Sequence, residues 1–114
     1  MIIGVGVDIV NIKRFKKIVK NNPKILDRIL TERELKLFKN YKDSLIHYAG
    51  RFSLKESIIK AGKDYLNIKS YKDIEILKDN EGNLVLIKPK GKIFISLSHD
   101  GDYIVSMAII EKND

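Results

Sequence analysis

The chain opens on an alternating run, residues 2–10 with the sequence IIGVGVDIV, which restricts its fold more than any other segment. β-branched residues favour a strand, and successive side chains of a strand point to opposite faces. Branched apolar residues share one face: Ile3, Val5, Val7 and Ile9. Gly4, Gly6 and Asp8 share the other, and a glycine face lets a second backbone or a ligand approach closely. We therefore expect tight packing beside the carboxylate of Asp8.

Capping signals predict several helices after this strand. Asn11 is a suitable N-cap for a helix over residues 12–20. Asn22-Pro23 is expected to restart a helix, with proline in its first position. The sequence TERE, residues 31–34, is a capping box that begins another helix.

The second half of the chain is expected to form one long helix and two hairpins. The helix covers residues 43–61 and ends at Gly62, and the hairpins cover residues 73–89 and 92–110. The order of one strand, several helices and about four antiparallel strands predicts a single α+β domain over residues 1–114. Its antiparallel sheet is packed on helices.

Composition narrows the classes of protein. The chain has 114 residues, no cysteine and two histidines, which excludes disulfides, thiolate catalysis and zinc–thiolate sites. It contains no apolar run long enough for a membrane span, and its first residues are read as a strand, not a signal peptide, so a cytoplasmic location is expected. A net charge of +7 favours acidic partners of several kinds.

Asp8, Glu56 and Lys60 are the candidate catalytic residues. Glu56 and Lys60 are four residues apart on the long helix, beside a row of small residues made of Ala49, Ser53 and Ser57. If this row packs on the glycine face, Glu56 meets Asp8, and two adjacent carboxylates need a cation between them. An oxygen-only site of this kind suits Mg²⁺ with phosphate ligands, and Lys60 would add a second charge. The alternatives are an exposed ion pair and an aspartate that caps a helix.

The segment SLSHDGD, residues 96–102, supplies further candidates. Ser96 and Ser98 share one face of a strand, and His99 lies at the end of a hairpin. A serine hydrolase is excluded because adjacent strand residues point in opposite directions. Turn capping is the alternative interpretation of these residues.

A basic segment near the N-terminus predicts a docking surface for an acidic partner. Its residues combine positive charge with apolar side chains: Arg14, Ile18, Lys24, Ile25 and Arg28. Charge of this kind mainly sets association rate and partner choice. The alternative is an ordinary solvated helix face.

Four segments, taken together and in order, resemble one family. GVGVDIV, ILTERELKLF, GRFSLKESIIKA and ISLSHDGDYIVSMAII are similar to segments of the holo-[acyl-carrier-protein] synthases. These proteins form the short, single-domain branch of the 4′-phosphopantetheinyl transferases. The resemblance extends from residue 2 to about residue 110.

The resemblance implies transfer of 4′-phosphopantetheine from coenzyme A to a serine of apo-acyl carrier protein, with Mg²⁺ as cofactor and adenosine 3′,5′-bisphosphate as by-product. It assigns Asp8 and Glu56 to the metal, and Lys60 with the segment Ser96, Ser98 and His99 to coenzyme A. It assigns the basic segment (Arg14, Ile18, Lys24, Ile25, Arg28) to the carrier protein, and it implies a homotrimer with active sites between subunits. The family's usual Gly-X-Pro is absent at Gly82-Asn83-Leu84.

Two other classes of protein would require different sequence features. A small basic nucleic-acid-binding module would need exposed aromatic residues among lysines and arginines on a sheet or groove. Phe94 and Tyr103 do not form such a platform, so no nucleic-acid partner and no membrane partner are expected. A non-catalytic scaffold that only docks a carrier protein would lack one of Asp8, Glu56 and Lys60.

Overall fold

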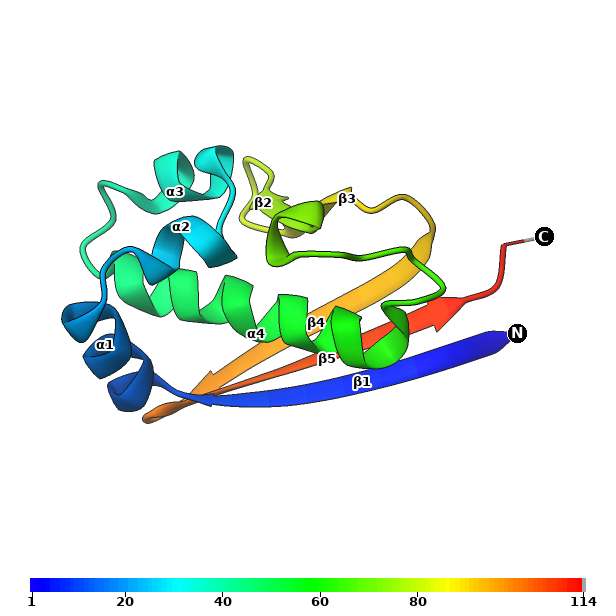
Figure 1. The fold of residues 1–114 in the computed structure, drawn as a ribbon, viewed down its shortest axis with the longest axis horizontal. Coiled ribbons are helices and arrows are strands. Elements are labelled where there is room, and N and C mark those ends of the chain that lie inside the picture. The colour runs from blue at the N-terminus through cyan, green and yellow to red at the C-terminus, as the bar shows by residue number, and fades with distance from the viewer. Residues whose placement is uncertain (114) are drawn as a thin grey trace.

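One long helix lies between two antiparallel sheets in the computed structural model, which describes residues 1–113 (Figure 1). The elements, in chain order, are β1 (Ile2–Asn11), α1 (Ile12–Asn21), α2 (Ile25–Ile29), α3 (Glu32–Phe38), α4 (Ser44–Gly62), the 3₁₀ helix η1 (Tyr71–Asp73), β2 (Glu75–Lys78), β3 (Leu84–Lys88), β4 (Lys92–Asp100) and β5 (Tyr103–Glu111). The expected α+β class, with antiparallel strands packed on helices, is confirmed.

The larger sheet has the strand order β1-β5-β4, and both pairings are antiparallel. Asp8 of β1 lies opposite Ser106 of β5, which in turn lies opposite Leu97 of β4. α4 runs along the face of this sheet to which Asp8 belongs (Figure 1). β1 ends at Asn11 and α1 begins at the next residue. The end of β1, α1 and the start of α4 therefore lie at the same end of the molecule (Figure 1).

The sequence prediction was wrong in two details of the fold. The strands after α4 do not form a single sheet with β1, because β2 and β3 pair only with each other within residues 1–113. The second helix does not start at Pro23: Pro23 and Lys24 form a turn in which Ile25 N–H donates to Asn22 O at 3.1 Å, and α2 begins at Ile25. The N-terminus of α2 is therefore preceded by a backbone turn and is not capped by the Asn22 side chain.

The expected caps of α1 and α3 are confirmed. Asn11 Oδ1 accepts from Arg14 N–H at 3.0 Å. In the capping box, Thr31 Oγ1 accepts from Glu34 N–H at 3.2 Å, while Glu34 Oε1 accepts from Thr31 N–H at 2.8 Å. Such caps satisfy amide groups that have no partner inside the helix.

Gly4 and Gly6 allow α4 to approach β1 at backbone distance. A Cβ atom added to Gly4 would lie 1.8 Å from Ala61 O, and one added to Gly6 would lie 1.9 Å from Ser57 O. No side chain fits in that space, so the expectation of tight packing on the glycine face is confirmed. The prediction depended on the absence of Cβ atoms from that face.

Two apolar clusters flank α4 and fix its position. The first is enclosed by α1, α2 and α3 and includes fully buried Leu30, Phe38 and Ala49. The second lies between α4, the β2–β3 sheet and β5, and includes Leu54, Ile58 and Ile76. None of the helices in residues 1–113 combines the length and apolar character that spanning a bilayer requires.

The other face of the β1-β5-β4 sheet, which we call the outer face, is apolar and exposed. β1 contributes Val5, Val7 and Ile9, which are 55%, 52% and 63% exposed. Met107 of β5 and Phe94 of β4 continue the same surface. No element within the described part of the chain covers it, and contiguous exposed apolar surface of this kind marks an interface.

The glycine contact can be tested with Gly6→Ala. We expect its free energy of unfolding to fall by at least about 2 kcal/mol, the upper range for overpacking, because the new methyl group meets backbone and not a movable side chain. Chemical denaturation followed by circular dichroism measures this change. Gly50→Ala is the control, because its added Cβ would meet only a Leu97 methyl group at 3.3 Å. A Gly6→Ala variant as stable as the wild type would contradict the packing.

Candidate active site

Asp8 and Lys60 meet where α4 crosses β1. Lys60 Nζ lies 3.0 Å from Asp8 Oδ1 and also donates to Val7 O at 3.1 Å. The Asp8 side chain is only 11% exposed, whereas that of Lys60 is 51% exposed. Asp8 Oδ2 is buried and has no hydrogen-bond partner among the residues that the structure describes. Buried carboxylate oxygens are normally paired, so this oxygen is available to a ligand.

Glu56 lies on the neighbouring turn of α4, and its carboxylate is held by a tyrosine. Tyr71 of η1 donates its hydroxyl hydrogen to Glu56 Oε1 at 2.6 Å. Burial, this bond and the negative charges of Glu56 and Asp8 raise the pKa of Tyr71 to about 12. The structure thus pairs Asp8 with Lys60 and Glu56 with Tyr71, a residue outside the sequence motifs. A direct meeting of Glu56 with Asp8 stays a prediction.

The donor set around Asp8 and Glu56 fits an oxygen-coordinated divalent cation. Asp8 Oδ2 is an acceptor without a partner, and no group of three or more His, Cys, Asp or Glu side chains suitable for a metal occurs within residues 1–113. Two carboxylates cannot complete the coordination of Mg²⁺, which takes its remaining ligands from water and substrate phosphates. The residues present therefore fit a cation that is shared with a bound substrate.

The predicted coenzyme A segment of β4 does not join this site within one chain. Ser96 pairs with Met107, and Ser98 pairs with Val105, so both serines lie on the outer face. Leu97, between them, lies on the face of the sheet that carries Asp8. β4 is also two strands away from β1, about 10 Å across the sheet. His99 lies at the β4–β5 turn, where its Nε2 is 3.0 Å from Gly101 O.

Four of the five predicted docking residues surround apolar cavities beside this site. A cavity of about 280 Å³ is lined by Phe15, Ile18, Ile25, Arg28, Ile29, Phe52 and Tyr71. A smaller one, of about 160 Å³, lies next to it and includes Arg14 and Ile18 in its lining. Lys24 lines neither cavity and is exposed at the start of α2.

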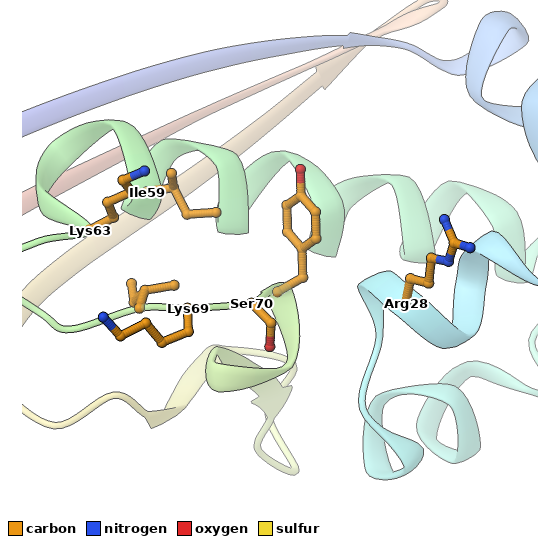
Figure 2. A pocket seen from close by; sticks show the side chains of 7 residues that line it. Arg28, Ile59, Lys63, Lys69 and Ser70 are labelled. Atoms are coloured by element: carbon orange, nitrogen blue, oxygen red, sulfur yellow. The ribbon is translucent and has the colours of Figure 1, made fainter.

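A larger cavity of about 460 Å³ is also lined by Tyr71 (Figure 2). Arg28 stands at one end of it, and Lys63 and Lys69 lie toward the other, with Ile59 of α4 between them (Figure 2). Tyr71 and Arg28 line both this cavity and the apolar one. The site is therefore bordered by a cationic cavity and by an apolar cavity.

A buried ion pair holds the helix turn that carries Glu56. Lys55 Nζ lies 2.6 Å from Glu34 Oε1 and donates to Ile29 O at 2.7 Å, and both charged side chains have 0% exposure. The second Glu34 oxygen accepts from Ile76 N–H at 2.8 Å. Burial lowers the pKa of Lys55, against the attraction of Glu34. The capping box drew attention to Glu34 in the sequence, but no sequence pattern predicted that Lys55 is buried.

A family model described as the 4′-phosphopantetheinyl transferase superfamily matches residues 4–108. A holo-[acyl-carrier-protein] synthase of Streptococcus pyogenes is 41% identical over 97% of this chain and 98% of its own length. The chain belongs to the 4′-phosphopantetheinyl transferase superfamily. Within it, the similarity is to the holo-[acyl-carrier-protein] synthases, which confirms the resemblance drawn from the four sequence segments.

Solved structures give the same result. A Bacillus anthracis holo-(acyl-carrier-protein) synthase in complex with CoA (3′,5′-ADP) matches with a TM-score of 0.85 and 33% identity, covering 99% of both chains. A Neisseria meningitidis holo-[acyl-carrier-protein] synthase matches with a TM-score of 0.84 and 26% identity over 98% of this chain and 100% of that one. A Helicobacter pylori enzyme of the same name, in complex with coenzyme A, matches with a TM-score of 0.76 and 30% identity over 94% of this chain and 99% of that one.

Lys55→Met tests the buried pair. We expect it to lower the free energy of unfolding by about 3–5 kcal/mol, because Glu34 would be left as a buried charge without a partner. Lys36→Met removes a charge from the exposed pair with Glu32, whose atoms are 3.8 Å apart, and should change stability far less. Denaturant unfolding of both variants measures the difference. Equal stability of the two variants would show that Glu34 is not isolated in the core.

Proposed function

We propose that this chain transfers the 4′-phosphopantetheine group of coenzyme A to a serine hydroxyl of apo-acyl carrier protein. The products are holo-acyl carrier protein and adenosine 3′,5′-bisphosphate, and the reaction depends on Mg²⁺ and supports fatty acid biosynthesis in the cytoplasm. The observation that carries the proposal is the buried Asp8 Oδ2, which has no partner within residues 1–113 although Asp8 Oδ1 binds Lys60. The names of the relatives support the same activity.

Asp8 and Glu56 are the residues that would hold the Mg²⁺. When bound, the cation neutralises phosphate charge and stabilises the leaving bisphosphate. Lys60, half exposed, would offer its ammonium group to the coenzyme A phosphates, and its bond to Asp8 Oδ1 keeps it at the site. The carboxylates of Asp8 and Glu56 are the candidate acceptors for the serine proton. Phosphoryl transfer depends mainly on such positioning and charge balance.

A homotrimer would complete the site. The outer face of β1-β5-β4 is apolar and exposed, as a subunit interface requires, and it carries Ser96 and Ser98 away from the carboxylates of their own chain. A neighbouring subunit packed on this face could bring its carboxylates close to Ser96, Ser98 and His99. The prediction that these three residues bind the nucleotide then applies between chains.

The docking residues form a surface suited to an acidic carrier protein. Arg14 and Arg28 are exposed next to the apolar cavity lined by Ile18 and Ile25, and Lys24 adds charge nearby. Cationic groups around an apolar recess favour a partner helix that carries carboxylates around an apolar side chain. A nucleic-acid-binding module is not supported, because Phe94 and Tyr103 lie on strands of the sheet, whereas the basic segment lies on and beside the helices α1 and α2.

The activity is tested by mass spectrometry of an apo-acyl carrier protein incubated with coenzyme A, Mg²⁺ and this protein. We expect the carrier to gain about 340 Da, one phosphopantetheine group. Glu56→Gln should reduce the rate more than about 100-fold, since a lost metal ligand removes several kcal/mol of charge stabilisation. Glu32→Gln, on the exposed surface of α3, is the control. Tight, salt-sensitive DNA binding without transfer to any carrier would favour the nucleic-acid class.

The docking surface is tested by Arg14→Glu. We expect the KM for the carrier protein to rise roughly tenfold and the KM for coenzyme A to change little, because the reversed charge repels an acidic helix. Lys112→Glu makes the same change in net charge at the opposite end of the molecule, next to the C-terminus (Figure 1). An equal effect of the two variants would assign the change to overall charge and not to this surface.

A further inference from the structure

Tyr71 is the one hydrogen-bond donor that the structure gives to the Glu56 carboxylate within residues 1–113. Its hydroxyl binds Oε1 at 2.6 Å, and Oε2 accepts no hydrogen bond there. We propose that Tyr71 is the positioning residue of the metal site: it fixes Glu56 through Oε1 and leaves Oε2 for the divalent cation. This inference rests on the proposed function and adds to it a residue that no motif contains.

The two carboxylates of the site are held in the same manner. Among the described residues, Lys60 binds Asp8 Oδ1 and leaves Oδ2 without a partner, just as Tyr71 binds one oxygen of Glu56 and leaves the other. Each carboxylate therefore presents one oxygen. Carboxylates that bind metals are generally held by outer hydrogen bonds of this kind, which set their orientation.

A neutral donor on Glu56 also preserves the charge that attracts a cation. Asp8 and Glu56 contribute two negative charges and Lys60 one positive charge, which leaves a net charge of about −1. A second lysine in place of Tyr71 would bring that sum to zero. The phenol gives orientation without neutralising the carboxylate, which is the property that a cation site needs.

The ring of Tyr71 is fixed from two sides, so its hydroxyl is a well-placed donor. η1 is tied down by Asp73, whose Oδ2 accepts from Lys69 N–H at 2.8 Å and from Ser70 N–H at 3.0 Å. On the other side, the Tyr71 ring packs at 5.8 Å between centroids on the ring of Phe52 in α4. A donor that is already ordered loses little conformational freedom when the metal binds.

Tyr71→Phe separates the hydroxyl from the ring. The phenylalanine ring still packs on Phe52 and still lines the two cavities that Tyr71 borders, so only the bond to Glu56 is lost. Tyr65→Phe is the matched control: it removes the hydroxyl of an exposed tyrosine that accepts from Asn113 N–H at 3.1 Å, away from the carboxylates.

The first measurement is the binding of Mn²⁺, a paramagnetic substitute for Mg²⁺, followed by electron paramagnetic resonance with and without coenzyme A. We expect Tyr71→Phe to raise the Kd for Mn²⁺ about tenfold, the lower range for loss of an outer hydrogen bond to a metal ligand, and Tyr65→Phe to leave it unchanged. The Mg²⁺ concentration for half-maximal transfer should rise by a similar factor, while the KM for carrier protein stays the same. An unchanged Kd in Tyr71→Phe would overturn the proposal.

The second measurement distinguishes weaker metal binding from a general loss of stability. Each variant is melted with and without Mn²⁺, and the rise in Tm caused by the metal is compared with the variant's own metal-free Tm. A smaller rise in Tyr71→Phe supports a positioning role, whereas an equal rise with a lowered metal-free Tm shows a structural role and overturns it. If the wild type transfers phosphopantetheine and binds Mn²⁺ but Tyr71→Phe behaves the same, only this inference fails. If the wild type does neither, the proposed function fails too.

Discussion

The approach of the α4 backbone to the β1 backbone is the constraint on which the site depends. Gly6 faces Ser57, and Gly4 faces a position one helical turn further along α4. Two residues of strand advance about 6.6 Å and four residues of helix about 6 Å, so the two backbones stay in step. The next step along β1 reaches Asp8, level with the turn of α4 that carries Glu56. A side chain at either glycine would separate the two carboxylates by lifting the helix.

Where α4 packs on Ser106 of β5, the contact is polar and its hydroxyl groups are satisfied, which makes the neighbouring Asp8 informative. Ser106, the partner of Asp8 across the sheet, has its Oγ 2.7 Å from Ser53 Oγ and 2.5 Å from Ser57 Oγ, and it donates to Ser53 O at 2.8 Å. Buried hydroxyl groups that bond to one another avoid the cost of burial without a partner. In this setting the lack of a partner for Asp8 Oδ2 in the described part of the chain is not explained by loose packing, and it indicates a position for a ligand.

The site residues that the sequence predicts belong to local patterns, whereas those that it does not predict depend on contacts between distant parts of the chain. The glycine face of β1 and the four-residue spacing of Glu56 and Lys60 are local patterns. The structure packs α4 on the glycine face as expected and places Lys60 beside Asp8. Lys55 and Tyr71 could not be found, because a lysine beside a glutamate in a helix normally faces solvent and a lone tyrosine after a loop carries no periodicity. Their roles follow from partners 21 and 15 residues away in the chain.

The charge of the whole chain and that of the site have opposite signs, and this difference is consistent with the proposed chemistry. A net charge of +7 attracts polyanions such as coenzyme A and an acidic carrier protein over long range. At short range, Asp8 and Glu56 repel a diphosphate, since Lys60 balances only one of them. Under the proposed function, a divalent cation held by Asp8 and Glu56 would turn that repulsion into attraction. Under the proposed function, the site would therefore bind its anionic substrate together with a divalent cation.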